Sequence, residues 1–314
     1  MMSMKVKIWL ALGAVYVIWG STYLAIRFAV ETIPPFLMVA TRFLIAGAIL
    51  YGFRRLRGDA PPSRVEWKAA AVVGILLLVG GNGIVVWAEQ YIPSGITALI
   101  VGTAPVFMVL IDALRPGGQR PGFKRALGIL IGFAGIVILI NPSGVSQDPD
   151  RWVMIGLGAL FLATFFWALG SLYNRNARLP GSPLLGTGVE MLVGGGCLLV
   201  IATLTGEWGR LDLASISTRS LWGLAYLIVF GALIGFVAYT WLLRVAPTPL
   251  VSTYAYVNPL IAILLGSWLA QEALDLRILL AAVVIVSSVF LINTGRAAPP
   301  VPRTVIVDPT SGDD

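Results

Sequence analysis

Two ionisable side chains stand inside long apolar stretches of the chain. Arg42 lies eight residues into the run 34–56, and Glu190 lies seven residues into the run 183–205. A charged group within a bilayer costs a few kcal/mol, so it normally faces the protein interior and has a partner. At about 1.5 Å per residue the two backbones differ in depth by roughly 8 Å in a core about 30 Å thick. We therefore predict that Arg42 and Glu190 pair with each other or meet in one polar network.

The chemistry of this charge network has two interpretations. Glu190 is either a protonatable coupling site, or a counter-charge for a cationic substrate, within a transport mechanism. Alternatively, Arg42 and Glu190 form a buried salt bridge that fixes how their two helices pack. A carboxylate held tightly by an arginine is a poor proton carrier at neutral pH, because the positive charge lowers its pKa. The sequence leaves both interpretations open.

Polar residues also gather before a proline in the stretch Ser252–Pro259, which reads STYAYVNP. Pro259 lacks a backbone donor and should kink its helix near Ala255. Loosened backbone within a bilayer is tolerated where protein or a water-filled cavity surrounds it. A similar stretch, GTAP, occurs in the first half of the chain. The sequence therefore predicts helix kinks at Pro105 and Pro259 and cavity-facing side chains at Thr103, Tyr254, Tyr256 and Asn258; the alternative is a packing kink with tyrosines facing lipid.

Several aromatic and small polar residues complete the predicted cavity. Trp19 and Trp167 lie about twelve to fifteen residues into their apolar runs, too deep for the aromatic belt at a membrane surface. Ligand sites are largely apolar with a few polar anchors, and aromatic faces attract organic cations. The alternative is packing within the core. The predicted cavity residues from these segments are Trp19, Ser21, Tyr23, Asn82, Trp87, Trp167 and Ser171, with Tyr173 and Trp241 as related positions.

Composition restricts the class of protein strongly. The chain has 314 residues, of which 58% are hydrophobic and only 12% are charged, and its mean hydropathy is +0.88. Soluble domains carry about 25% charged residues, so this is a membrane protein. Histidine is absent and Cys197 is the single cysteine, which argues against histidine-based catalysis, a metal site or an internal disulfide. The chain also lacks the GxxxxGK[ST] motif of ATP-driven proteins. We therefore expect no enzyme, cofactor, metal or nucleic-acid partner.

Apolar stretches of spanning length predict an all-α polytopic protein of ten transmembrane helices. Each stretch has about 19 to 25 residues, enough to cross a bilayer. Sixteen loop Lys and Arg residues fall on one side and four on the other, which predicts that both termini are cytoplasmic. The predicted spans are 7–30, 34–56, 67–88, 93–114, 122–140, 152–174, 183–205, 219–243, 248–270 and 276–294.

The chain also repeats itself at an offset of about 150 residues. Trp19 and Arg27 recur as Trp167 and Arg175, each 148 residues later, and Pro105 recurs as Pro259. The same alignment relates Trp87 to Trp241, Arg125 to Arg277, and Arg42 to Glu190. Because five spans is an odd number, the second copy must enter the membrane from the opposite side. The sequence therefore predicts two inverted-topology repeats, an architecture typical of alternating-access transporters.

The motifs WGSTY (19–23), WALGSLY (167–173), PSGITALIVGTAPVF (93–107) and TYAYVNPLIAILLG (253–266) resemble the drug/metabolite transporter (DMT) superfamily. The chain is similar to proteins with two EamA-type domains, and most similar to bacterial inner-membrane exporters among them. This resemblance covers about residues 7–295. It implies a ten-helix fold and export of small metabolites or toxic amphiphiles, with amino acids, nucleosides and cationic drugs among relatives' substrates and protons as a proposed coupling ion. The family has no shared substrate motif.

These observations together predict the organisation and function of the chain. The first EamA repeat spans 1–141, the second spans 142–295, and 296–314 is a disordered cytoplasmic tail. The predicted function is secondary-active export of small metabolites or amphiphilic and cationic compounds, such as amino acids or drugs, by alternating access. The partners are a small-molecule substrate, the lipid of a bacterial inner membrane and protons, and the chain is a monomer or homodimer. The alternative function is a flippase for lipids or lipid-linked intermediates.

Overall fold

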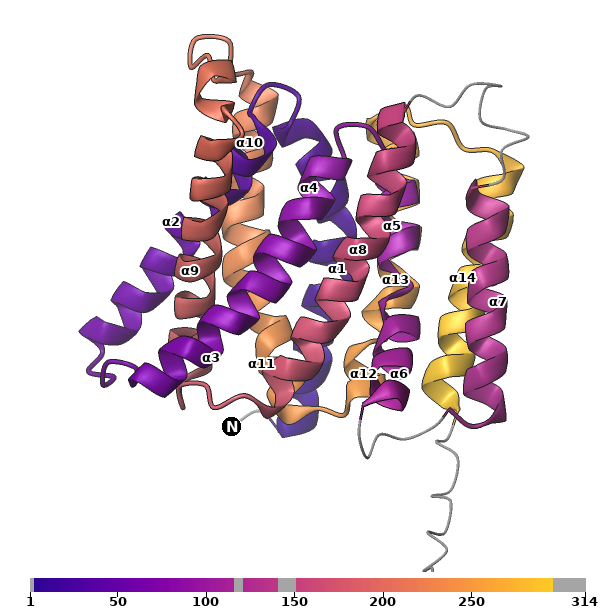
Figure 1. Cartoon of the computed structure of the whole chain (residues 1–314), viewed down its shortest axis with the longest axis horizontal. Helices are drawn as coiled ribbons and strands as arrows, with labels where there is room; N and C mark the ends of the chain where they lie inside the picture. Colours follow the sequence, from indigo (N-terminus) through magenta and orange to yellow (C-terminus); the bar gives the residue numbers. More distant parts are fainter. Residues whose placement is uncertain (1–2, 116–120, 141–150, 296–314) are drawn as a thin grey trace, which may run out of the picture.

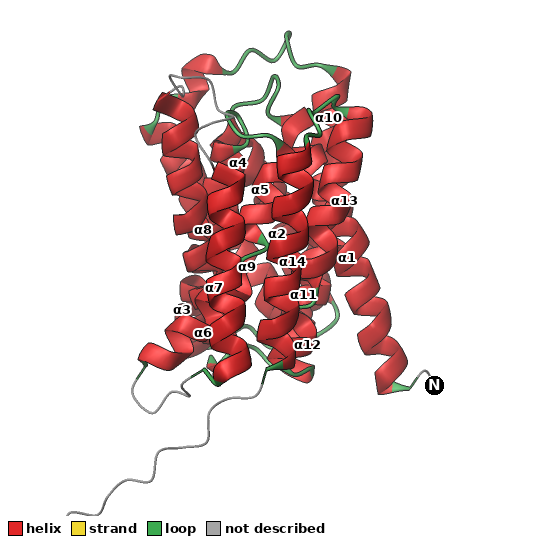
Figure 2. Cartoon of the chain, turned by 90° about the vertical axis from the view of Figure 1, so that its right-hand side faces the viewer, coloured by secondary structure: helices red, strands yellow, loops and turns green. Residues whose placement is uncertain are grey.

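The computed structural model describes residues 3–115, 121–140 and 151–295. The predicted disordered tail therefore lies outside the described residues. Those residues form helices joined by short loops, without a strand (Figure 2).

The helices follow the ten predicted spans in order. The first five spans are α1 (Met4–Ala29), α2 (Pro35–Leu56), α3–η1–α4 (Arg64–Gly74, Ile75–Gly83 and Ile84–Ala88), α5–α6 (Ser94–Val101 and Ala104–Leu114) and α7 (Phe123–Ile140). The next five are α8 (Arg151–Asn176), α9 (Pro183–Leu204), α10–η4–α11 (Thr218–Tyr226, Leu227–Phe236 and Val237–Val245), α12–α13 (Thr248–Val251 and Tyr254–Leu269) and α14 (Leu276–Thr294). A short 3₁₀-helix, η3 (Glu207–Arg210), follows α9.

Within the described part of the chain, eight helices are long and apolar enough to cross a membrane, and Tyr254–Leu269 is a shorter apolar helix. The predicted all-α polytopic fold is confirmed. Helix α1 begins and α14 ends at the lower end of Figure 1, which we call the N-terminal face; the upper end is the opposite face.

Helices pack against each other in pairs that the internal repeat relates. Helix α2 packs along its counterpart α9, and α7 packs along its counterpart α14. Helix α1 contacts η4 and α13 of the second repeat, while α8 contacts η1, α5 and α6 of the first. Apart from the contact between α8 and α5, each of these contacts has a partner under exchange of the two halves, as an inverted repeat requires. The core of the bundle is therefore built jointly by both repeats.

Two spans in each repeat depart from a regular α-helix at matching places. Segments η1 and η4 are π-helical, and they lie about 152 residues apart. The fourth and ninth spans are each broken at two residues, 102–103 and 252–253. Such irregularities within apolar helices often occur at functional sites. Because they recur in both halves, we expect the functional site near the centre of the bundle, where the two halves meet.

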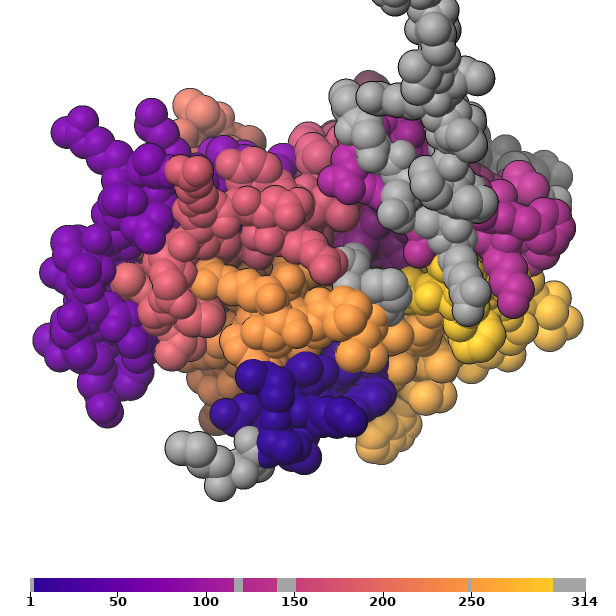
Figure 3. All heavy atoms as spheres, turned by 90° about the horizontal axis from the view of Figure 1, so that it is seen from below, coloured from indigo at the N-terminus to yellow at the C-terminus, as the bar shows by residue number. Residues whose placement is uncertain are grey.

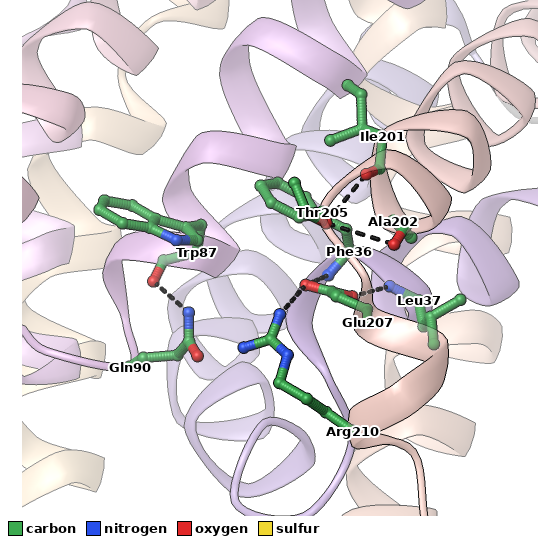
Figure 4. A network of polar contacts seen from close by, with 9 residues as sticks. All are labelled: Phe36, Leu37, Trp87, Gln90, Ile201, Ala202, Thr205, Glu207 and Arg210. Atoms are coloured by element: carbon green, nitrogen blue, oxygen red, sulfur yellow. Dashed lines mark hydrogen bonds and ion pairs between the residues drawn. The ribbon is translucent and has the colours of Figure 1, made fainter.

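Acidic side chains hold the N-terminal ends of two helices. Both carboxylate oxygens of Glu207 accept hydrogen bonds at the start of α2, from the backbone nitrogens of Phe36 (3.2 Å) and Leu37 (2.8 Å), and Arg210 lies 3.4 Å from the same carboxylate (Figure 4). Glu272 accepts from the backbone nitrogens of Ser94 (2.8 Å) and Gly95 (3.2 Å) at the start of α5. These contacts satisfy donors that a helix leaves unpaired, and they suit its dipole.

A third acid lies in the loop after α2. Asp59 pairs with Arg54 at 2.6 Å, and the arginine holds the pKa of the Asp59 carboxyl below its usual value. Both groups are partly exposed at the N-terminal face, so this pair contributes little to folding.

Close approach of α3 and α9 predicts a sharp difference between two glycines. A Cβ at Gly74 would lie 2.4 Å from the backbone oxygen of Glu190, whereas a Cβ at Gly196 would meet nothing within 4 Å. Gly74→Ala should destabilise the fold by about 1–3 kcal/mol because the backbones must separate. Gly196→Ala is the matched control and should not destabilise it. Thermal unfolding of both purified variants in detergent measures this, and equal midpoints would contradict the packing described.

Candidate functional site

A small cavity lies near the centre of the bundle, and we call it the chamber. Its volume is about 50 Å³, enough for a few water molecules. It extends from mid-depth toward the opposite face, because its lining on α1 runs from Trp19 to Ile26. Both repeats contribute to it. The chamber is lined by Trp19, Thr22, Tyr23, Ile26, Arg42, Gly81, Asn82, Val85, Val101, Ala163, Trp167, Phe236 and Tyr254.

Four aromatic rings pack together at the end of the chamber that lies toward the N-terminal face; we call Trp19, Trp167, Tyr239 and Tyr254 the aromatic plug. The Trp19 and Trp167 rings meet edge to face at 5.4 Å between centroids. Tyr239 lies 4.8 Å from Trp19 and 5.4 Å from Trp167. Tyr254 lies 5.7 Å from Trp19 and 5.6 Å from Tyr239. Such edge-to-face and tilted contacts are favourable for aromatic rings, so the plug is a packed unit.

Hydrogen bonds fix the rings of the plug. The Trp167 Nε1 donates to the Tyr254 hydroxyl at 3.0 Å, and the hydroxyls of Ser171 and Tyr239 share a hydrogen bond at 2.6 Å. The Trp19 Nε1 donates to the backbone oxygen of Gly231 over a longer 3.4 Å. Because buried polar groups are costly without partners, these bonds favour one arrangement of the rings.

The π-helical segments make room for the two tryptophans. A Cβ at Gly235 in η4 would lie 2.7 Å from the Trp19 Nε1, and a Cβ at Gly81 in η1 would lie 2.8 Å from the Trp167 ring. Each tryptophan therefore packs on a glycine of the other repeat, at positions 154 residues apart. The two tryptophans and the glycines that support them thus obey the same two-fold relation as the helices.

The broken helices cross beside the plug. A Cβ at Gly102 would lie 3.0 Å from the Pro259 side chain, so the break in the fourth span packs against the proline of the ninth. Pro105 lies in the first turn of α6, where its missing N–H is not needed. The sequence predicts a kink near Ala255, and the ninth span is interrupted two residues before that position. The interruption is at 252–253, where Ala255 and Tyr256 donate to residues three places back in tight turns, and Pro259 stays inside α13.

The structure places some predicted cavity residues around the chamber and others elsewhere. Trp19, Tyr23, Asn82, Trp167 and Tyr254 line it. Ser171, Thr103 and Asn258 are buried outside the lining, Ser171 beside the plug. Ser21 bonds Tyr226 and Tyr256 donates to the Val289 backbone oxygen, so these two point to neighbouring helices, whereas Trp87 packs on Tyr91 in the turn after its own helix.

Arg42 and Glu190 do not pair, contrary to the prediction. The Arg42 Nη1 donates to Asn82 Oδ1 at 3.5 Å, whereas the Glu190 Oε1 accepts from Asn174 Nδ2 at 3.4 Å. Both side chains are almost fully buried. Their helices do pack together, but depth along an axis does not determine which side of the helix a side chain occupies. Arg42 faces the chamber and Glu190 does not line it.

Arg244 is the cation on the Glu190 side of the bundle. Its Nη1 donates to the Pro180 backbone oxygen at 2.9 Å. Its Nη2 lies 2.8 Å from where a Cβ on Gly186 would be, one helical turn before Glu190. Neither Arg244 Nε nor the second oxygen of Glu190 has a hydrogen-bond partner among the described residues. Glu190 therefore sits in a loosely bonded polar site between α8, α9 and α11.

Sequence reasoning missed several of these residues. Tyr239 belongs to the plug, and Phe236 lines the chamber. The one sequence signal for them is their place in an apolar span that also contains Thr240. Glu89 follows the third span and is fully buried, and neither of its carboxylate oxygens has a hydrogen-bond partner in the described structure. The Arg27 Nη1 donates to the Glu89 backbone oxygen at 2.9 Å instead.

Comparison with known proteins defines the class as a membrane transporter. The model of the EamA-like transporter family matches residues 5–141 and 154–294, and the chain belongs to this family of the DMT superfamily. The two matches correspond to the two halves seen in the structure.

Relatives and a solved structure agree with that assignment. The chain is 39% identical over 305 residues to the uncharacterized inner membrane transporter YedA of Escherichia coli K12, covering 96% of each chain. It is 25% identical to PagO of Salmonella typhimurium, covering 94% and 95%, and 24% identical to a WAT1-related chloroplastic protein of Arabidopsis thaliana, covering 91% and 69%. One crystal structure shares the fold, with a TM-score of 0.66 at 20% identity over 92% and 96% of the chains. The expected resemblance to bacterial inner-membrane transporters is confirmed.

The hydrogen bonds of the plug predict an asymmetry between its two tryptophans. Trp167→Phe should destabilise the protein more than Trp19→Phe, by about 1 kcal/mol, because only Trp167 makes a short bond to a buried side chain. The repeat-related Trp19 variant is the matched control, since both lose the same volume. Thermal unfolding in detergent measures the difference. A larger loss for Trp19→Phe would contradict this account of the plug.

Proposed function

We propose that the chain is a secondary-active exporter that moves small metabolites or amphiphilic compounds by alternating access. The observation that carries the proposal is the central chamber, built by both repeats and closed on one side by a repeat-related pair of tryptophans. A cavity of about 50 Å³ is far below the roughly 300–1,000 Å³ of small-molecule sites. The chamber must therefore widen when it takes up a substrate.

The plug is the part that has to move. It lies between the chamber and the N-terminal face. On that face the end of α11, in orange, lies between the indigo start of α1 and the rose end of α8 (Figure 3). The halves are related by an inverted repeat, so each half can adopt the conformation of the other. We therefore expect that the rings of the plug part on the N-terminal side while the bundle closes on the opposite side. We propose a bacterial inner-membrane location with both termini cytoplasmic, on the basis of the basic loops and the transporter relatives.

Protons are the proposed coupling ion, and Glu190 is the proposed carrier. Its second carboxylate oxygen is unbonded and its nearest hydrogen bond is long, so no tight ion pair holds it charged. Glu89 is a second buried carboxyl, near the other end of the bundle, and serves as a matched comparison.

Cysteine labelling tests the alternation. In a Cys197→Ser background, an impermeant maleimide should label Thr22→Cys in the chamber but not Ser171→Cys beyond the plug. A transported compound should make Ser171→Cys react and slow the reaction of Thr22→Cys. The two sites reacting together in every condition would indicate an open pore and contradict alternating access.

Transport in proteoliposomes tests the coupling. Counterflow with amino acids, nucleosides and amphiphiles, with and without a pH gradient, should identify an exchanged compound. Glu190→Gln should then abolish uptake driven by the pH gradient and leave the protein folded, whereas Glu89→Gln should retain it. If Glu190→Gln keeps normal rate and pH dependence, the coupling role is wrong; loss in Glu89→Gln alone would move that role to Glu89.

A flippase for lipids or lipid-linked intermediates is the second candidate, favoured by a lateral groove. The groove has a volume of about 700 Å³ between α1, α10, η4 and α13, and its lining is almost entirely apolar, with Arg219 among it. It shares no lining residue with the chamber, so a lipid there would follow a different path. Scrambling of a labelled lipid without uptake of any soluble compound would favour this function over export.

A further inference from the structure

The chamber holds a positive charge that the protein does not balance. Arg42 is 3% exposed and projects from α2 into the chamber lining. Its contacts are one long hydrogen bond to Asn82 and the Phe43 ring, which lies 4.8 Å from the guanidinium carbon. The Arg42 Nε has no partner, and no carboxylate of the described residues lies within ion-pair distance of it. An arginine stays protonated in proteins, so it cannot relieve this charge by losing its proton.

The lining residues add no negative charge either. Among the thirteen, Arg42 is the ionisable cation and there is no Asp or Glu. Glu190, the acid predicted to neutralise it, bonds Asn174 instead. A buried charge without a partner is costly, and the guanidinium offers a planar fork of donors that matches a carboxylate. This combination disfavours the cationic substrates expected from the sequence and favours anions.

Aromatic side chains form a large part of the remaining lining, and Trp19 among them lies next to the charge. A Cβ at Gly231 would lie 2.8 Å from the Arg42 Nη2, and the Trp19 Nε1 donates to the backbone oxygen of the same glycine. The guanidinium and the plug are thus separated by about one residue of η4. A ligand that reaches both needs its acidic group close to its apolar body.

We propose that the chamber binds small organic anions, with a carboxylate on Arg42 and an apolar, preferably aromatic, body against Trp19 and Trp167. This inference deepens the proposed export function and rests on it for the identity of the chamber as a substrate site. Arg42 is then a specificity-determining residue, which donates two parallel N–H hydrogen bonds to the carboxylate. Asn82 positions the guanidinium in the absence of ligand.

Binding to the purified protein tests the proposal without transport. The probes are 3-phenylpropionate, its neutral amide 3-phenylpropionamide and the cation 3-phenylpropylamine, which share one apolar body. Isothermal titration in detergent should give at least tenfold weaker binding for the amide and the amine than for the carboxylate. Equal affinity for the three probes, or tighter binding of the amine, would overturn the proposal.

Variants separate charge recognition from packing. Arg42→Gln should remove the preference for the carboxylate, Arg42→Lys should keep part of it, and Asn82→Ala should weaken it because Asn82 positions the guanidinium. Arg57→Gln, an exposed arginine at the end of α2, is the matched control and should bind as the original protein does. If Arg42→Gln fails to fold, Arg42→Lys and Asn82→Ala carry the test. Retention of the full preference in a folded Arg42→Gln variant would overturn the proposal.

Transport assays distinguish the anion site from the export function. If the protein binds 3-phenylpropionate through Arg42 but exchanges no compound in counterflow, the anion site stands and the export function fails. If it exchanges amines or neutral compounds, and Arg42→Gln does so equally well, export stands and the anion site is wrong.

Discussion

The whole architecture depends on two tryptophans from opposite repeats meeting edge to face at the centre of a bilayer-spanning bundle. Rings of this size fit there because each packs on a glycine in a π-helical segment of the other half. That arrangement brings α1 against η4 and α8 against η1, and it leaves the chamber above the two rings, which are themselves part of the plug. Close contact between the two tryptophans thus maintains the two-fold relation between the repeats. This contact lies at the end of the chamber, where a substrate would have to pass.

The second constraint is the cost of charge in an apolar bundle. Glu207 and Glu272 offset this cost by accepting hydrogen bonds from backbone N–H groups at helix N-termini. Each carboxylate thereby stabilises donors that the helix leaves unpaired. The cost is not offset in this way at Arg42, Glu190 and Glu89, since each keeps at least one polar atom without a hydrogen-bond partner among the described residues. Natural proteins retain such groups within membranes mainly where they act on substrates or ions. The contrast separates structural charges from candidates for function.

Much of the fold could be predicted from the sequence because hydropathy and the offset of about 150 residues are properties of the chain alone. The apolar runs gave the helices, and the recurrence of Trp19 as Trp167 pointed to residues that do line the chamber. The position of the helix break and the partners of Arg42 and Glu190 could not be predicted. They depend on the direction of each side chain around its helix and on neighbours from the other repeat. Tyr239 was missed for the same reason, since its role arises from contact with both tryptophans.

A structure in lipid nanodiscs with a transported compound bound tests the central claim most directly. The account predicts the compound in a widened chamber, between Arg42 and the rings of Trp19 and Trp167, with access from one face only. A compound bound instead in the lateral groove along α1 and α10, with the chamber no wider than before, would contradict it.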